Sequence, residues 1–174
     1  MVDAAMETRG WAKIALITVP VIVLAGSASG WLSNSGYEND WFASLLKPPF
    51  MPPGWAFGLA WTVLYVLMGV ALAMVLAAPA ADVRRTALIL FFVQLAVNFA
   101  WSPVFFAGHD INLAKVVIFA MAAIAAAAAG QFFRIRATAG LLMLPYLAWL
   151  VFAAVLTATI QQLNPDAGTS LLGF

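Results

Sequence analysis

The sequence contains no cysteine and very little charge. Only 9% of its 174 residues are Asp, Glu, Lys or Arg, against 65% hydrophobic residues and a mean hydropathy of +1.00. The lack of cysteine excludes disulfides, thiolate metal sites and cysteine nucleophiles. The lack of charge excludes a soluble domain, because a chain of this length cannot hide so much apolar surface from water. The net charge of +1 gives no support to nucleic-acid binding.

Long apolar runs fill the chain instead. Five of them reach the roughly 20 residues that cross a bilayer, and none alternates polar and apolar residues as a barrel strand would. We therefore predict an all-α integral membrane protein, a single domain over residues 1–174 built as a bundle of five transmembrane helices. Short connections between the later helices predict that they are antiparallel neighbours. The expected spans are residues 11–32, 55–78, 86–106, 111–133 and 140–163, with a loop over residues 33–54.

The first span also carries features of a secretory signal. Arg9 and Lys13 precede an apolar run that ends in the small residues 26–30, as before a cleavage site. Apolar character then resumes, so we interpret the segment as a retained span. With five spans, the basic residues at 84–85 and 134–136 fall on the same side as Arg9 and Lys13. This predicts a cytoplasmic amino terminus if the protein lies in an inner membrane.

Charged side chains of the kinds used in membrane catalysis and coupling are missing from the spans. None of the five expected spans contains Asp, Glu, His or Arg, and proton relays, voltage sensors and ion-coupled transporters depend on such groups. No carboxylate pair, metal cluster, nucleotide loop or Ser/His arrangement is visible, and the one histidine, His109, lies in a short connection. We therefore expect no metal site, no required cofactor, and no hydrolytic or metal-dependent enzyme.

Aromatic residues form a stripe on the expected second helix. Phe57, Trp61 and Tyr65 are four residues apart, which places them on one helical face. An aromatic packing ridge is one interpretation. Trp61 and Tyr65 lie well inside the span, however, where an indole N–H or a phenol needs a partner. Their position favours a face directed toward the interior of the bundle.

The expected third helix carries two amides. Gln94, Asn98 and Trp101 share one face, and amides in hydrocarbon are costly unless they are hydrogen-bonded. Either the amides bond between helices, or one of them meets a polar group of a ligand. Pro103 must open or kink this helix near its end, and Asp110 is a suitable N-cap for the helix that follows.

The expected fifth helix carries a third candidate wall. Tyr146, Trp149 and Ala153 share a face, and a small residue beside two aromatics suits a slot for a flat molecule. Close helix packing explains the pattern equally well. On the fourth helix, the small residues over 120–130 predict packing within the bundle or against a second subunit.

The loop over residues 33–54 is too long to be a simple connection. Loops of this length in a compact domain are usually functional or disordered. Four prolines, including Pro52 and Pro53, argue against disorder because each one fixes its own φ and restricts its neighbour. Lys47 in this loop is interpreted either as a solvated charge or as a partner for a ligand carboxylate.

Together these motifs resemble the TspO/translocator protein family, formerly called peripheral benzodiazepine receptors, and in particular its bacterial members. The resemblance runs over about residues 11–164 and implies a five-helix bundle, usually dimeric, that binds tetrapyrroles such as protoporphyrin IX and haem. It also implies synthetic isoquinoline and benzodiazepine ligands, and a pocket among helices one, two, three and five under the long loop. The segments that carry it, in family order, are WFASLLKPPFMPPGWAFGLAWTVLY, QLAVNFAWSPVFF and LPYLAWLVFAAVL.

Carried over residue by residue, the resemblance places this pocket on named positions. It implies helix-two aromatics, a helix-three Asn and Trp, a helix-five wall and a proline lid. Together with the helical stripes, the expected ligand-binding residues are Pro52, Pro53, Phe57, Trp61, Tyr65, Asn98, Trp101, Tyr146, Trp149 and Ala153.

The sequence departs from the family pattern in two places. Pro49 and Phe50 stand where some relatives have a tryptophan, which removes one stacking group. The cholesterol motif of some members requires Lys or Arg shortly after a tyrosine, and no basic residue follows Tyr146. Cholesterol binding is therefore not carried over to this chain.

Three functions are compatible with the sequence. The first is a tetrapyrrole-binding membrane receptor or regulator in which Trp61 and Trp149 stack on the ring, with a lipid bilayer and a second copy of the chain as partners. The second is a light-dependent porphyrin-degrading enzyme that uses the same tryptophans, as reported for some bacterial relatives. The third is a transporter of porphyrins or lipids, because the lack of intramembrane charge does not argue against passive flux.

Overall fold

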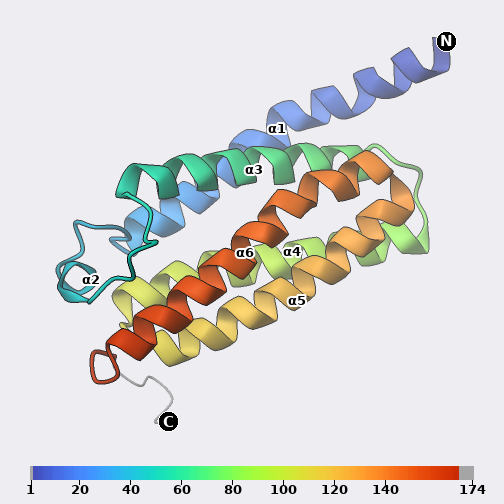
Figure 1. Ribbon diagram of the computed structural model, residues 1–174. Coiled ribbons are helices and arrows are strands. Elements are labelled where there is room, and N and C mark those ends of the chain that lie inside the picture. The colour runs from blue at the N-terminus through green and yellow to red at the C-terminus, as the bar shows by residue number, and fades with distance from the viewer. Residues whose placement is uncertain (1, 169–174) are drawn as a thin grey trace.

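The protein is a bundle of helices (Figure 1). The computed structural model describes residues 2–168, and the side chains of residues 10–168. Five helices in this part of the chain are long and apolar enough to cross a membrane, which confirms the predicted all-α, multi-pass membrane fold. The elements are α1 (Val2–Leu32), α2 (Asp40–Ser44), α3 (Gly54–Leu76), α4 (Asp82–Ser102), the π-helical turn η1 (Pro103–Ala107), α5 (Ile111–Ile135) and α6 (Ala137–Leu163).

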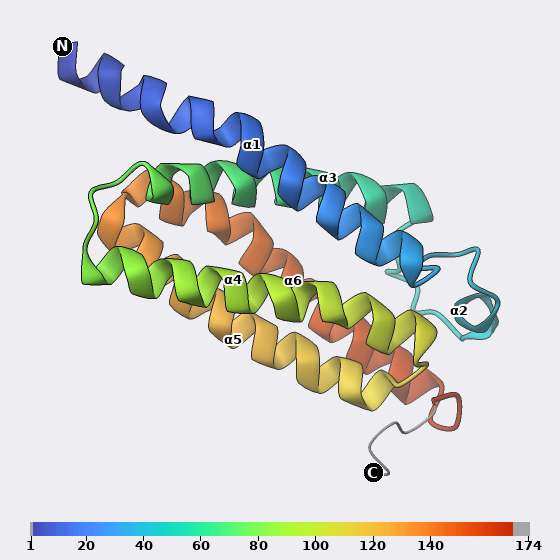
Figure 2. The same ribbon diagram turned by 180° about the vertical axis from the view of Figure 1, so that it is seen from behind.

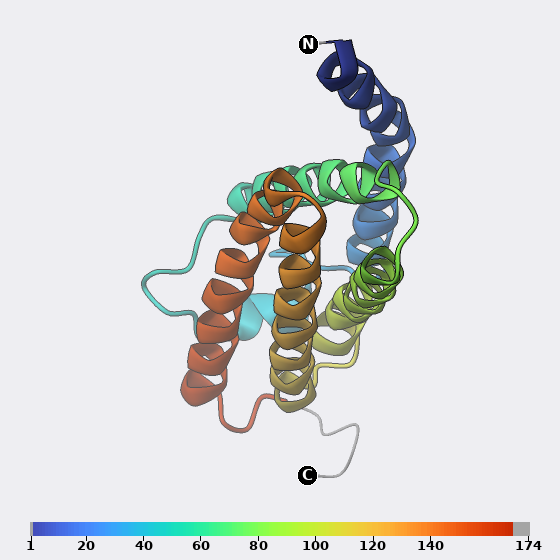
Figure 3. The ribbon, with the colours of Figure 1, turned by 90° about the vertical axis from the view of Figure 1, so that its right-hand side faces the viewer.

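Figures 1 and 2 show the five long helices from opposite sides, and the view along them in Figure 3 shows that they form a ring. α1 packs along α3, α3 against α6, α6 against α5 and α5 against α4, while α4 meets α1 more thinly. The predicted pairing of sequence neighbours therefore holds for α4, α5 and α6. It fails for α3 and α4, which touch only sparsely, because α1 lies along α3 on that side of the ring.

α1 and α3 meet backbone to backbone. The Thr18 hydroxyl donates a hydrogen bond to the Gly69 carbonyl oxygen over 2.8 Å. A Cβ on Gly69 would lie only 2.7 Å from the Cα of Val19, so only glycine fits there. Small residues permit this kind of close approach between membrane helices. The contact sets the course of α1 and places its last turns over the interior of the bundle.

α4 begins earlier than the sequence predicts. Its first residue is Asp82, whereas the expected span starts at residue 86. The polar residues at 82–85 are helical, and Arg84 donates a hydrogen bond to the Ala78 carbonyl over 2.7 Å. Hydropathy locates the edge of the apolar run, and a helix can continue beyond that edge into water.

Pro103 changes the type of helix at the end of α4. Proline has no N–H and cannot continue the α-helical ladder, and the Gly108 N–H bonds instead to the Pro103 carbonyl five residues back, over 2.8 Å. This π-helical turn confirms the predicted opening of the helix. It directs Phe105 inward, where its ring stacks on Trp101 with 5.0 Å between centroids.

α5 begins after the predicted N-cap, and its small residues lie both in the core and on the outer face of the bundle. The Asp110 carboxylate accepts a hydrogen bond from the Leu113 N–H over 2.8 Å, which confirms the predicted N-cap. Ala125 and Ala128 are fully buried, where they allow the close packing expected within the bundle. Gly130 on the outer face is exposed, and the second subunit expected against this helix stays a prediction.

Candidate functional site

The aromatic stripe of α3 faces α6 inside the bundle. The ring of Trp61 lies 5.4 Å from that of Tyr65 and 6.2 Å, edge to face, from that of Trp149. Phe57 meets Trp149 edge to face at 5.8 Å. These geometries are the ones that aromatic pairs prefer. The two helices therefore present one continuous aromatic wall.

This wall lines a central cavity of about 370 Å³. α1, α3, α4, α5 and α6 all contribute to its lining, and none of the lining side chains is Asp, Glu, Lys, Arg or His. Within the described residues, no three His, Asp or Glu side chains come together as a metal site. The cavity therefore suits an apolar molecule held by shape and aromatic contact.

Seven of the ten expected ligand-binding residues lie on this cavity. Tyr146 does not line it, because its side chain is fully buried between helices. Pro52 and Pro53 do not line it either: Pro52 accepts a hydrogen bond from Tyr37 in the lid loop, and Pro53 is the residue before α3. The seven that line it are Phe57, Trp61, Tyr65, Asn98, Trp101, Trp149 and Ala153.

The two amides of α4 belong to a buried polar network. The Tyr65 hydroxyl donates to Asn98 Oδ1 over 3.0 Å, and Asn98 Nδ2 donates to the Tyr146 hydroxyl oxygen over 3.1 Å. Tyr146 in turn donates to Gln94 Oε1 over 2.9 Å. Both amides thus bond between helices, as one interpretation of the sequence held. Asn98 also lines the cavity, whereas Gln94 does not.

One indole in the wall has no hydrogen-bond partner. Trp149 Nε1 is the only buried side-chain nitrogen or oxygen without a partner among the described residues. The corresponding N–H of Trp101 is satisfied by the Ala114 carbonyl at 3.1 Å. A buried N–H without an acceptor costs free energy. Because Nε1 is itself buried, the Trp149 ring would have to turn before this N–H could meet a molecule in the cavity.

α1 supplies one wall, as the family resemblance implies for the first helix, although no residue of this helix was among the expected ligand-binding residues. A Cβ on Gly26 would lie 2.2 Å from the ring of Tyr65, so the tyrosine ring occupies the space that glycine leaves. The Ser29 hydroxyl closes α1 onto α4 by donating to the Phe99 carbonyl over 2.6 Å. The sequence pattern that could have indicated this wall is the run of small residues at 26–30, which also resembles a cleavage site. Its packing role is clear only when the position of Tyr65 opposite Gly26 is known.

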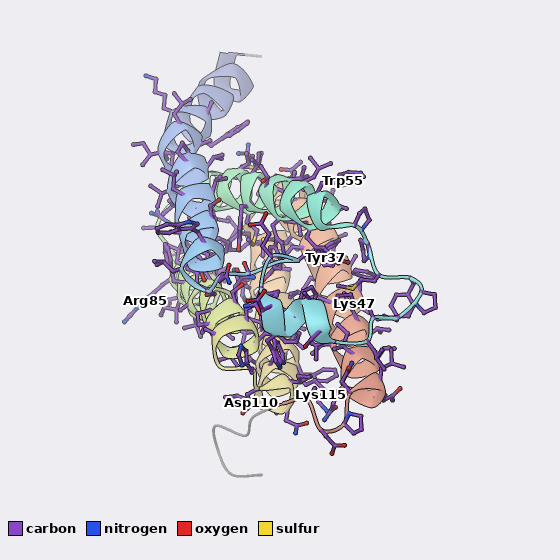
Figure 4. The ribbon with its side chains drawn as sticks, turned by 90° about the vertical axis from the view of Figure 1, so that its left-hand side faces the viewer. Tyr37, Lys47, Trp55, Arg85, Asp110 and Lys115 are labelled. Carbon is purple, nitrogen blue, oxygen red and sulfur yellow. The ribbon has the colours of Figure 1, made fainter. Side chains whose placement is uncertain are left out.

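The opening of the cavity lies between α1 and α3, beneath the lid loop, which we define as residues 33–53. The exposed lining residues Ser27, Gly58 and Thr62 belong to these two helices. Tyr37 stands at this opening, where partial burial raises its pKa above the ordinary value. Figure 4 looks onto this end, with Tyr37 directed between the helices.

The lid loop is anchored to the carboxyl-terminal end of the bundle. Asn164 exchanges two hydrogen bonds with the backbone of Leu46, at 2.8 and 2.9 Å. The Trp41 indole donates to the Ala167 carbonyl over 2.8 Å. Asn39 caps the short helix α2 by accepting from the Phe42 N–H over 3.0 Å. The loop is thus a fixed cover with a helix of its own.

Lys47 is engaged within the lid loop. Its ammonium donates to the carbonyls of Phe42, Ala43 and Leu45, at 2.7 to 3.1 Å, and lies 4.9 Å from the centre of the Phe42 ring. Partial burial lowers its pKa below the ordinary value. Three backbone carbonyls use the three protons of the ammonium. Lys47 therefore stabilises the end of α2 and does not line the cavity.

Comparison with known proteins connects this arrangement to one family. A sequence model of the TspO/MBR family matches residues 17–163. The chain is 39% identical over 132 residues to "Tryptophan-rich protein TspO" of Chlorobaculum tepidum, covering 72% of this chain and 80% of that protein. It is 36% identical over 149 residues to the protein of the same name from Archaeoglobus fulgidus, covering 86% and 96%. It is 34% identical over 154 residues to "Translocator protein" of Ovis aries, covering 84% and 90%.

Proposed function

The chain belongs to the TspO/MBR family, and we propose that it is a membrane receptor or regulator that binds tetrapyrroles. Protoporphyrin IX and haem are the ligands of this proposal, together with other flat, hydrophobic molecules. The ring lies in the central cavity between Trp61 and Trp149 on one side and α1 on the other. No cofactor is required, because the porphyrin is itself the ligand.

The observation that carries this proposal is an aromatic-walled cavity without charge inside a membrane bundle. A porphyrin has a broad apolar face that gains by stacking on indoles. Phe57, Trp61 and Trp149 present such a wall. The cavity lies beneath an anchored lid, which shields a bound ring from water.

The direct test is titration of the protein in lipid nanodiscs with protoporphyrin IX. Two of the indoles line the proposed ring site, so saturable quenching of tryptophan fluorescence at one ligand per chain is expected. Nanodiscs without the protein, titrated in the same way and corrected for inner-filter absorption, give the background. Quenching that rises linearly without saturation would contradict the proposal.

The neutral cavity also predicts how the porphyrin carboxylates behave. No described side chain on the cavity carries a charge, and the ammonium of Lys47 is used by backbone carbonyls. Losing a charge-assisted hydrogen bond would weaken binding by about 1.5–3 kcal/mol, or more than about tenfold. We expect the dimethyl ester of protoporphyrin IX to bind within about threefold of the diacid in the same titration. A loss of more than tenfold in the ester would instead place a cation at the ligand edge.

A second candidate function is light-dependent oxidation of the bound porphyrin by molecular oxygen. The observation that favours it is the contact of Trp61 with Trp149, two oxidisable rings 6.2 Å apart on the cavity wall. If the protein does this, illumination bleaches bound porphyrin faster than free porphyrin, and oxygen removal stops the difference. Replacing both tryptophans by phenylalanine abolishes it while the ring site remains aromatic. Bleaching at the rate of free porphyrin would exclude this function.

The distribution of basic residues supports the predicted orientation. Arg84 and Arg85 lie in the first turn of α4, and α5 turns into α6 at Arg136; both of these ends lie at the end of the bundle that faces the viewer in Figure 3. Lys47 and Lys115 lie at the lid end in Figure 4, with Arg85 behind them. Cytoplasmic ends of membrane proteins carry the excess of Lys and Arg. We therefore propose that the lid end faces away from the cytoplasm in an inner membrane.

A further inference from the structure

The polar network beside the cavity includes two residues that line the cavity and two that do not. We call Gln94, Tyr146, Asn98 and Tyr65 the amide relay, in the order in which their side chains are hydrogen-bonded. Gln94 and Tyr146 are fully buried and do not line the cavity, whereas Asn98 and Tyr65 do. The relay therefore joins the interior of the bundle to one wall of the cavity.

The protons of the relay all point one way. A tyrosine has a single proton, and the Tyr146 proton is given to Gln94 Oε1 over 2.9 Å. Its oxygen then serves as acceptor, and Asn98 Nδ2 donates to it over 3.1 Å. Because the amide nitrogen of Asn98 faces Tyr146, its carbonyl oxygen must face Tyr65 and the cavity. Gln94 thus determines, through Tyr146, which end of the Asn98 amide the cavity meets.

Two methionine sulfurs oppose the reverse arrangement. Gln94 Nε2 faces the Met68 sulfur at 3.9 Å, and Asn98 Nδ2 faces the Met121 sulfur at 3.4 Å. A thioether has no proton and is only a weak acceptor, so an amide N–H beside it is favourable and an amide oxygen is not. Turning either amide would lose these contacts. These weak contacts reinforce the direction that Gln94 and Tyr146 set, and losing them costs less than leaving the buried Tyr146 proton without an acceptor.

We propose that Gln94 and Tyr146 are positioning residues that set the hydrogen-bond polarity of the cavity wall. The relay makes Asn98 and Tyr65 present oxygen acceptors there, and the wall selects a flat ligand that brings an N–H or O–H donor to it. The Tyr65 proton cannot serve a ligand acceptor without leaving the buried Asn98 oxygen short of its donor. This inference rests on the proposed function, since it concerns the same cavity.

Three flat tricyclic probes of similar size separate donor from acceptor recognition. Carbazole offers an N–H, acridine offers a ring nitrogen as acceptor at a pH where it is neutral, and fluorene offers neither. Each is titrated in nanodiscs by its ability to displace protoporphyrin IX, and directly by its own fluorescence. Trp149 and the rest of the aromatic wall are the same in wild type and variants. The change in the carbazole-to-acridine affinity ratio therefore isolates the relay.

In the variant Gln94→Leu, Tyr146 loses its acceptor and turns its proton to the Asn98 oxygen, so the amide nitrogen then faces the cavity. One exchanged hydrogen bond shifts the carbazole-to-acridine ratio toward acridine by roughly fivefold, while fluorene affinity changes little. Tyr146→Phe removes the link without a cavity-lining change, and shifts the ratio in the same direction by less. Thr159→Val, which removes a hydroxyl bonded only within its own helix on an outer position, leaves the ratio unchanged.

The outcomes are distinguishable from failure of the proposed function. An unchanged ratio in both folded relay variants overturns the relay, even where protoporphyrin IX still binds. A shift of the opposite sign overturns the assigned direction of the protons. If none of the three probes binds the wild-type protein, the selection of donor-bearing ligands at this wall is overturned. The proposed function is decided separately, by the porphyrin titration alone.

Discussion

A chain in which both Trp61 and Trp149 are replaced by alanine is expected to bind protoporphyrin IX more weakly than wild type by somewhat less than about a hundredfold. Each indole lines the cavity and supplies a large flat contact for the ring. Truncating one buried aromatic anchor costs about 1.4 kcal/mol or more, which is roughly tenfold in affinity. Each single variant is therefore expected to lose about tenfold.

The two losses are not independent. The rings of Trp61 and Trp149 contact each other at 6.2 Å, and residues in contact couple energetically. Removing the first indole leaves the second without its edge-to-face neighbour, so the second truncation costs less than it does alone. The double variant should consequently lose somewhat less than the product of the two single losses.

Trp55→Ala is the matched control for these variants. It removes the same kind of side chain from the helix that carries Trp61, but Trp55 is 72% exposed and points away from the bundle in Figure 4. We expect its porphyrin affinity to equal that of wild type. Binding should be read from the porphyrin absorbance band, because removing tryptophans alters the fluorescence signal. A double variant that binds within about twofold of the control would show that the ring lies elsewhere.

The aromatic walls could be predicted because large side chains at helical spacing carry a strong signal. Phe57, Trp61 and Tyr65 on α3 share a face by spacing alone, and the structure places all three on the cavity. Tyr146 and Trp149 were assigned together on α6, yet they lie three residues apart. A three-residue step turns a helix by less than a full revolution, so one ring enters the core and the other meets the cavity.

Three other parts of the site are only weakly indicated by the sequence, namely the α1 wall, the helix α2 and the contacts of Lys47. The wall on α1 consists of small residues such as Gly26. Because Gly26 has no side chain, the ring of Tyr65 can pack against the α1 backbone. The five-residue helix α2 is too short for a periodic pattern, although Asn39 before Asp40 is a usual start signal. The engagement of Lys47 by three backbone carbonyls depends on α2 and could not be foreseen without it.

The replacement Gly69→Ala is expected to destabilise the protein by about 1–3 kcal/mol through overpacking. The added Cβ would meet the Val19 Cα at 2.7 Å and its backbone nitrogen at 3.0 Å. Backbone atoms of α1 cannot rotate away as a flexible side chain would, so the whole helix must shift. Such a shift also stretches the hydrogen bond from Thr18 to the Gly69 carbonyl.

Gly130→Ala provides a control with the opposite sign. Nothing lies within 4 Å of a Cβ at Gly130, which is an exposed position inside α5. Alanine favours a helix over glycine by up to about 1 kcal/mol, so this variant should be at least as stable as wild type. Thermal unfolding in one detergent, followed by tryptophan fluorescence, should give a lower Tm for Gly69→Ala and an unchanged or higher Tm for Gly130→Ala. Equal Tm values would contradict a tight α1–α3 contact.

The same replacement should also weaken ligand binding, because α1 is a wall of the cavity. Gly26 and Ser29 follow the Gly69 contact along α1, and both line the cavity. When α1 moves outward, Gly26 leaves the ring of Tyr65 and the cavity widens on the side opposite Trp61. A flat ring then loses contact on one face. Gly69→Ala should therefore lower porphyrin affinity at temperatures where the protein is still folded, whereas Gly130→Ala should not.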